Sequence, residues 1–323
     1  MKIDAGFEGP VDQIREWAKK VEASGHFQGA WVSDTNNDPF LLSSALVAQT
    51  DHMTIGTNIA VAFARSPFCM AQTAYNLRHL SGGRFTLGLG TQVRAHITRR
   101  FSMDWPEKPV AAMKEYVCLL RHLFQCFQTN ERPSFHGDFF SCTLSSPVFT
   151  PTPHNFGPPP VGFAAVGPAA TRAAGEVAEA VFLHPFTHLK FLREVTLPAL
   201  AEGRASRDSS LRPLEVVGSA FCLSPDRADF ESQKQKALGR LAFYASTPNY
   251  APVVESLGYQ DLHSRLHDLS RRGEWQKMAQ TLPADFVEAC VVIAPRSEMI
   301  KALRDRFQSI YDRVVVDAQA LYE

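Results

Sequence analysis

The chain has 323 residues, of which 45% are hydrophobic and 20% charged, and its formal net charge is +0. A neutral surface argues against nucleic acid or an anionic membrane as a partner, and the apolar content is enough for a sizeable core. No apolar run reaches the ~18 residues of a membrane span, and the opening residues do not form a signal peptide, so the sequence predicts a cytoplasmic protein.

Short apolar runs alternate with amphipathic segments along the chain. The predicted strands are Lys2–Phe7, Gly29–Ser33, Met53–Ala60, Phe85–Leu89, Val161–Ala165, Ala180–Leu183, Leu214–Leu223 and Cys290–Ala294. The predicted helices between them are Val11–Ala23, Phe40–Gln49, Pro67–Leu80, Ala111–Phe127, Ala169–Val177, His188–Ala201 and Ser297–Ile310. Eight successive β-α units predict an α/β fold, a (β/α)₈ TIM barrel rather than a doubly wound sheet.

Two segments interrupt this spacing, residues 129–160 after the fourth predicted strand and residues 243–285 after the seventh. The first is rich in proline and contains a predicted hairpin at 135–140, and the second contains a predicted helix at Leu257–Ser270. Long insertions in compact barrels are usually lids or subunit contacts. We therefore predict a single domain over residues 1–323, with both insertions covering the mouth of the barrel.

Cysteine spacing points to no metal site, because no C-x-x-C or Cys/His ligand pattern occurs. The six cysteines are Cys69, Cys118, Cys126, Cys142, Cys222 and Cys290. We expect reduced, buried thiols rather than disulfides.

The most informative stretch runs from Leu80 to Thr91. Gly82-Gly83 predicts the end of a helix that begins at Ser66-Pro67, and a buried strand follows. That strand leads into Gly88-Leu89-Gly90-Thr91, so its glycines permit a ligand to approach the backbone at the carboxyl end of a parallel strand. The alternative is that these glycines serve only tight turns.

Other strands also end in candidate site residues. Asp34 follows the second predicted strand, although an Asx turn before a helix at Pro39 would explain the same cluster. Gly56-Thr57-Asn58 inside a strand suggests a bulge. Val166-Gly167 precedes a helix whose free N–H groups could seat a phosphate, or it is an ordinary βα turn.

Two further features could carry chemistry. A basic cluster follows Thr91 and could bind an anionic group, or pair with Asp104 and Glu107 instead. Its members are Arg94, His96, Arg99 and Arg100. Among possible acids and bases, His184 ends the sixth predicted strand and suits proton transfer near neutral pH, while Glu8 and Tyr244 are weaker candidates. A structural role for His184 is the competing interpretation.

The run from Leu80 to Thr91 resembles the signature of the luciferase-like monooxygenase superfamily, and residues 92–101 resemble its coenzyme F420-dependent branch. The resemblance implies a deazaflavin across the carboxyl ends of the strands. It also implies a non-proline cis peptide between Asn58 and Ile59, behind the central ring of the cofactor. The implied cofactor-binding residues are Asp34, Asn58, Ile59, Gly90, Thr91, Gln92, Arg94, Ala165, Val166 and Gly167.

The chain also departs from the family pattern. Several members have His at the position of Thr35 and sugar-phosphate dehydrogenases have Trp at that of Phe40, which counts against glucose 6-phosphate as substrate. Val93 stands where dehydrogenases often have a catalytic Glu. The proton must then come from another group, with His184 the first candidate and Asp34, Glu8 and Tyr244 behind it.

The resemblance therefore implies hydride transfer between deazaflavin C5 and an organic substrate, fairly apolar or peptide-like, with reduction of a C=C, C=N or C=O bond. It also implies a homodimer, because barrels of this family commonly pair. The alternatives are an FMN-dependent monooxygenase and a barrel that serves as a non-catalytic partner subunit.

Overall fold

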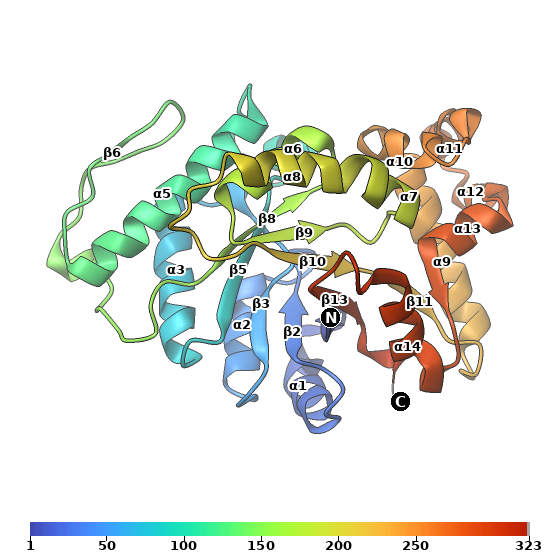
Figure 1. Ribbon diagram of the computed structural model, residues 1–323, viewed down its shortest axis with the longest axis horizontal. Coiled ribbons are helices and arrows are strands. Elements are labelled where there is room, and N and C mark those ends of the chain that lie inside the picture. The colour runs from blue at the N-terminus through green and yellow to red at the C-terminus, as the bar shows by residue number, and fades with distance from the viewer. Residues whose placement is uncertain (322–323) are drawn as a thin grey trace.

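A closed barrel of parallel strands forms the centre of the protein (Figure 1), whose computed structural model describes residues 1–321. The barrel strands are β1 (Lys2–Phe7), β2 (Gly29–Val32), β3 (Thr54–Thr57), β5 (Phe85–Gly90), β8 (Val161–Ala165), β9 (Ala180–Leu183), β10 (Glu215–Ser219) and β13 (Arg313–Asp317). They pair in the order β3-β2-β1-β13-β10-β9-β8-β5, and the pairing of β3 with β5 closes the ring. The short β4 (Ala60–Val61) pairs with β5 just beyond β3. The predicted (β/α)₈ barrel is confirmed.

Helices surround the barrel, and each of the longer helices buries one of its faces against the strands. The helices are α1 (Ile14–Ala23), α2 (Pro39–Val47), α3 (Pro67–Leu80), α4 (Arg94–Arg99), α5 (Pro109–Thr129), α6 (Pro168–Val177), α7 (Leu189–Phe191), α8 (Leu197–Ala205) and α14 (Arg296–Phe307). A π-helical turn at Leu192–Thr196 joins α7 to α8, and 3₁₀ turns lie at Val11–Gln13, Ala62–Ala64, Pro147–Phe149, Pro248–Tyr250 and Ala318–Ala320. None of the helices in residues 1–321 has the length and apolar character needed to cross a membrane.

Local sequence signals set the ends of α3 as predicted. The Ser66 hydroxyl accepts a hydrogen bond from the Cys69 N–H at 3.2 Å, and Pro67 occupies the first helical position. The helix ends at Gly82 and Gly83, whose φ angles of 62° and 87° lie in the left-handed region that favours glycine.

The predicted eighth strand is wrong. Residues Val291–Ile293 form β12, which pairs only with β11 (Phe221–Leu223) in a separate two-stranded sheet. The strand that completes the barrel is β13, between β1 and β10. Both segments contain a short β-branched run, so their local patterns are alike and the choice between them depends on partners far away in the chain.

The first insertion, residues 129–160, does not cover the barrel mouth as predicted. Its hairpin, β6 (Phe135–His136) with β7 (Ser141–Cys142), is present as expected, and the turn between them wraps around Glu115 of α5. The Glu115 carboxylate accepts hydrogen bonds from the N–H groups of residues 138–140 at 2.6–2.9 Å. A Cβ at Gly137 would lie 2.1 Å from that carboxylate, so a larger residue there would displace the Glu115 side chain from the turn. In Figure 1, β6 lies at the opposite end of the molecule from α9–α13.

The second insertion, residues 243–285, follows the seventh barrel strand as predicted. This region contains α9 (Phe230–Ala245), α10 (Ala251–Glu255), α11 (Gln260–Arg271), α12 (Trp275–Thr281) and α13 (Ala284–Cys290). These helices share a hydrophobic cluster with Phe186 and Phe191, which follow β9, and this cluster is separate from the main core. They lie at the end toward which the arrowheads of β8, β9 and β10 point in Figure 1. The second insertion therefore borders the carboxyl ends of the strands.

All six cysteines are free, as expected. Cys126 and Cys290 are buried, whereas Cys69 is exposed, contrary to the prediction that the thiols are buried. Burial raises the pKa of Cys222 and of Cys290 to about 12, which keeps both thiols protonated and unreactive.

Candidate functional site

Side-chain alternation decides which residues face the mouth of the barrel. Trp31, Phe182, Val217 and Val315 pack together in the barrel interior, apart from the main core outside it. Because successive strand residues point to opposite faces, the residue two positions beyond each of these faces the mouth. This rule gives Ser33, His184, Ser219 and Asp317. The strand registers place Glu8 and Asn58 on the same inward side, so six of the residues that face the mouth are Glu8, Ser33, Asn58, His184, Ser219 and Asp317.

Asn58 reaches across this mouth. Its Nδ2 donates a hydrogen bond to Ser219 Oγ at 3.2 Å, although β3 and β10 lie on opposite sides of the barrel. Its backbone is also fixed, since Asn58 N donates to Val32 O at 2.7 Å and Asn58 O accepts from Ser33 Oγ at 2.6 Å. The peptide bond from Asn58 to Ile59 is cis, as the family resemblance implies.

The glycines after β5 bring backbones close together here. A Cβ at Gly90 would lie 2.8 Å from Ile59 Cδ1, so glycine permits the close approach of the two segments. Thr91 and Gln92 follow, both half-buried, and Gln92 has a φ of 60°. Asn58, Ile59 and Gly90 therefore form a continuous floor, with Thr91 and Gln92 at its edge.

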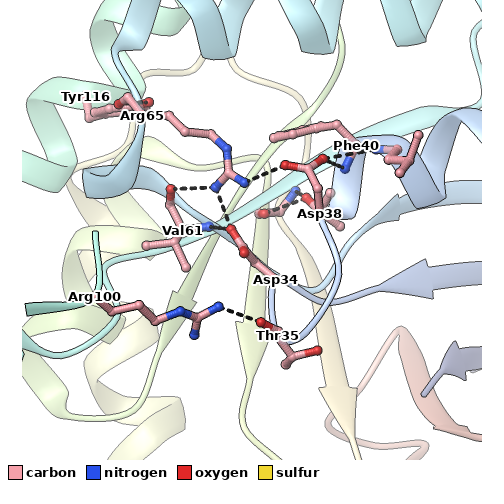
Figure 2. Close-up of polar contacts among 11 residues, drawn as sticks. Asp34, Thr35, Asp38, Phe40, Val61, Arg65, Arg100 and Tyr116 are labelled. Atoms are coloured by element: carbon pink, nitrogen blue, oxygen red, sulfur yellow. Dashed lines mark hydrogen bonds and ion pairs between the residues drawn. The ribbon is translucent and has the colours of Figure 1, made fainter. Parts of the chain in front are cut away.

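Asp34 lies beside this floor in an ion pair (Figure 2). Its buried carboxylate accepts hydrogen bonds from Arg65 Nη1 at 2.5 Å and from the Val61 N–H at 3.0 Å. Arg65 Nη2 bonds Asp38 at 2.9 Å, and the guanidinium lies 5.3 Å from the centroid of the Phe40 ring. The Asx turn weighed as an alternative belongs to Asp38, which caps α2, and not to Asp34. This arrangement favours a positioning role for Asp34.

His184 lies against two tyrosine rings of the second insertion. Its ring centroid is 4.4 Å from that of Tyr244 and 4.9 Å from that of Tyr250, and its Nδ1 accepts a hydrogen bond from the Phe186 N–H at 3.1 Å. Burial, with a smaller contribution from the nearby charge of Arg240, lowers the pKa of His184 to about 3. At neutral pH the ring is therefore neutral with its hydrogen on Nε2, which can donate a hydrogen bond but carries no imidazolium proton. Nothing in this environment supports the prediction that His184 supplies the proton.

The depressed pKa of His184 predicts a pH dependence of stability. Unfolded His184 takes up a proton near pH 6.5, while the folded protein resists until about pH 3, so the free energy of unfolding should fall as the pH drops through this window. Between pH 6.5 and 5 the loss should be about 2 kcal/mol. Urea unfolding at several pH values would measure it.

His184→Asn is the matched variant for this measurement, since its amide oxygen can replace Nδ1 as acceptor for the Phe186 N–H. We expect it to show a flatter pH dependence than the wild type. Equal slopes for the two proteins would contradict a buried, neutral His184.

Two carboxylates occupy neighbouring strands at the mouth. Glu8 forms a two-pronged ion pair with Arg240 of α9, at 2.8 and 2.9 Å, which connects β1 to the helix before the second insertion. Asp317 ends β13 and accepts a hydrogen bond from the Gln319 N–H at 3.0 Å. The pKa of the Asp317 carboxyl is raised, mainly because the surrounding protein removes part of its solvation. The negative charge of Glu8 nearby raises this pKa further.

Sequence reasoning missed Asp317 because it placed the eighth strand elsewhere. The available signal was the run Arg313–Asp317, an apolar strand that ends in a carboxylate. With Asp34 and Glu8 each paired to an arginine, Asp317 is a further candidate acid at the mouth.

The N–H groups at the start of α6 are not capped by a side chain. Gly167 precedes the helix, no side chain caps its N–H groups, and no atom lies within 4 Å of a Cβ placed at Gly167. Val166 and Thr187 line the same small pocket with Ala165 and His184. The Thr187 hydroxyl is buried and has no hydrogen-bond partner in residues 1–321.

The basic cluster lies on the neighbouring strand. β5 pairs with β8, so the loop after β5 borders the start of α6. Arg94 and Arg99 are exposed on α4 and form no ion pair with any described residue, including Asp104 and Glu107. Arg100 instead donates to the Thr35 carbonyl at 2.5 Å (Figure 2). Two cations without an ion pair among the described residues thus follow β5, the strand next to the one that leads into α6. No group of three or more His, Cys, Asp or Glu that could hold a metal ion occurs in residues 1–321.

Comparisons with known proteins agree with this geometry. Residues 3–313 match the family model described as luciferase-like monooxygenase. An uncharacterized protein of Mycobacterium tuberculosis is 36% identical over 98% of this chain and 92% of its own length. An F420-dependent glucose-6-phosphate dehydrogenase of Amycolatopsis mediterranei is 26% identical over 91% of this chain and 84% of its own.

Solved structures share the fold. The coenzyme F420-dependent tetrahydromethanopterin reductase of Methanopyrus kandleri superposes with a TM-score of 0.76 at 17% identity, covering 99% of this chain and 96% of its own. An F420-dependent secondary alcohol dehydrogenase superposes with a TM-score of 0.71 at 21% identity, and the match covers 100% of both chains. A type II Baeyer-Villiger monooxygenase of Pseudomonas putida, in complex with FMN, gives 0.64 at 15% identity over 98% of this chain and 92% of its own.

Proposed function

Because the chain belongs to the luciferase-like monooxygenase family, we propose that it is a coenzyme F420-dependent oxidoreductase acting on an organic substrate. The observation that carries this proposal is the pairing of a phosphate seat with unpaired cations. The uncapped start of α6 suits one phosphate, and Arg94 and Arg99 on the next loop suit a longer anionic tail. F420-dependent relatives among the similar proteins support the same cofactor.

When bound, the deazaflavin would supply or accept a hydride at C5. Asn58, Ile59 and Gly90 would support the ring, and Ala165, Val166 and Gly167 would hold the phosphate. The Asp34–Arg65 pair fixes the segment beside that floor. The rings of Tyr244 and Tyr250 border the mouth and exclude water from it, which favours hydride transfer.

We further propose reduction of a C=C, C=N or C=O bond in a fairly apolar or peptide-like substrate. The described mouth offers rings and carboxylates, and no cluster of cations remains there for a sugar phosphate once Arg240 is paired with Glu8. The proton would come from Asp317 or Tyr244, because Asp34 and Glu8 are paired and His184 is neutral. The expected cytoplasmic location remains a prediction.

The binding of F420 tests the proposal. Replacing Arg94 and Arg99 by Glu should weaken F420 binding about 100-fold, since charge-assisted contacts to the tail become repulsive. Binding of the tail-less deazaflavin core should change little. Equilibrium dialysis of both ligands measures the difference, and Arg15→Glu with Lys19→Glu on exposed α1 is the control with the same change of charge.

Equal losses for F420 and for the core would contradict this placement of the tail. A wild-type protein that binds FMN in preference to F420 and consumes oxygen with it would establish the monooxygenase alternative.

We also propose a homodimer. Large apolar side chains are exposed on the first insertion and on the end of α3, namely Leu80, Leu144, Val148, Phe149 and Phe156. Exposed apolar patches on one surface mark interaction sites. Sedimentation at micromolar concentration should give about twice the chain mass of 35.8 kDa, and a value near 35.8 kDa would contradict the proposal.

A further inference from the structure

Two histidines of the second insertion lie one helical turn apart on α11. His263 and His267 are four residues apart, the spacing at which side chains on one helix face are neighbours. Their ring centroids are 5.9 Å apart and the ring planes differ by 26°. Both side chains are half-buried, where α11 meets the end of α9. Neither residue belongs to the ring of positions that faces the barrel mouth.

The hydrogen bonds of these two rings decide which nitrogen carries a hydrogen. His263 Nδ1 lies 2.8 Å from the Ala245 carbonyl oxygen, and His267 Nδ1 lies 3.0 Å from the Ser246 carbonyl oxygen. A carbonyl oxygen only accepts, so each Nδ1 donates and each neutral ring keeps a lone pair on Nε2. Neither Nε2 bonds any residue in 1–321, and neither is a buried polar atom without a partner. Both Nε2 atoms are therefore open to solvent.

Two other histidines of the chain use their nitrogens differently. His154 and His188 are buried, and both nitrogens of each ring lie within hydrogen-bond distance of backbone groups. Those rings have no lone pair to offer a ligand. His263 and His267 each satisfy a carbonyl of α9 with one nitrogen and leave the other open. Metal-binding histidines have this arrangement, because their second nitrogen usually donates to a backbone carbonyl or a carboxylate.

We propose that His263 and His267 bind one divalent transition-metal ion, Zn²⁺, through their Nε2 atoms. Zn–N bonds of about 2.0–2.1 Å place two rings at a tetrahedral angle with their centroids about 5 Å apart, so the observed 5.9 Å must shorten by only about 1 Å. No third His, Cys, Asp or Glu of residues 1–321 joins them in a metal-binding group, so water would complete the coordination. Two protein ligands predict weaker binding than the four of a structural zinc site.

The site would hold the ion without hydrolytic chemistry. The zinc-protease motif also places two histidines four residues apart on a helix, but a Glu directly after the first one acts as the base. Ser264 occupies that position here. An ion held by α11 would fix both rings against the last carbonyls of α9, next to Tyr244. Metal binding should therefore stabilise the second insertion, whether or not the proposed cofactor is bound.

Titration calorimetry of ZnCl₂ into protein freed of metal with EDTA tests the proposal. We expect one ion per chain with a Kd on the order of 10 μM, and tighter binding of CuCl₂. His267→Asn is the matched variant, because its amide can still donate to the Ser246 carbonyl while the Nε2 ligand is lost. It should weaken Zn²⁺ binding at least about tenfold and leave the metal-free Tm nearly unchanged. His263→Asn should do the same, and it keeps the test valid if His267→Asn does not fold.

Cys69→Ser and His136→Asn are the controls, because an exposed thiol and a single exposed histidine on β6 are other places for a zinc ion. Both should leave the affinity unchanged. Hydrogen exchange of residues 245–271 should slow when ZnCl₂ is added to the wild type, and not in either histidine variant. No binding up to about 1 mM, full binding in both histidine variants, or loss of binding in a control would overturn the inference. Each of these outcomes leaves the proposed function intact, since F420 binding tests it separately.

Discussion

Replacing Asp4 by alanine should lower the free energy of unfolding by about 3 kcal/mol, because it removes the two closest hydrogen bonds of a buried arginine and leaves only the Glu215 carboxylate, 3.6 Å away. Asp4 is 0% exposed and accepts hydrogen bonds from Arg313 at 2.5 and 2.8 Å and from Trp31 Nε1 at 2.9 Å. Arg313 is itself 2% exposed, so solvent cannot replace the lost carboxylate. Urea unfolding followed by circular dichroism would measure the loss.

Glu16→Ala provides the control for this result. Glu16 pairs with Lys20 at 2.9 Å on the exposed surface of α1, and such exposed pairs contribute little to stability because solvent screens them. We expect its unfolding curve to lie close to that of the wild type. If Asp4→Ala were equally mild, the barrel would not depend on the ion pair in its interior.

Replacing Asp34 by alanine should cost about 3 kcal/mol of stability and also weaken F420 binding. The substitution removes the carboxylate partner of Arg65 and leaves the Val61 N–H buried without an acceptor. The segment after β3, which contributes Asn58 and Ile59 to the floor, would lose one of its attachments to the end of β2 and keep those through Val32 and Ser33. Urea unfolding and dialysis with F420 would record the two effects.

Asp38→Ala is the matched comparison, because Asp38 also contacts Arg65 but mainly caps α2. Loss of that cap should cost about 1 kcal/mol and leave F420 binding nearly unchanged. The opposite result would be an Asp34→Ala protein of normal stability and F420 affinity that no longer turns over. That outcome would restore Asp34 as the group that handles the proton.

Local signals in the sequence were sufficient where a residue acts on its own neighbours. Ser66 and Pro67 begin α3, and Gly82 and Gly83 end it. Each of these residues acts on backbone within one helical turn of its own position. The position of the second insertion was also predictable, because irregular composition interrupts the regular β-α spacing. These features depend on backbone geometry that each residue type prefers by itself.

Long-range contacts account for what the sequence could not reveal. The strand that completes the barrel is selected by pairing with β1 and by the ion pair of Arg313 with Asp4, 309 residues away. The chemistry of His184 is likewise determined by Tyr244 and Tyr250, which come from the second insertion. The hydrogen bond from Asn58 to Ser219 joins residues 161 positions apart in the chain, so no local sequence pattern predicts this contact.

The pairing of β1 with β13 also has a consequence for synthesis. A ribosome adds about 5–20 residues per second, so the first strand waits roughly 15–60 s for the strand that completes the ring. Until then β1 and β10 each present an unpaired edge, and Asp4 has no arginine to neutralise it. Chaperones that bind open sheet edges would therefore bind this chain during translation. The edges of β1 and β10 would be covered by the protein itself only after β13, which ends at residue 317, had emerged.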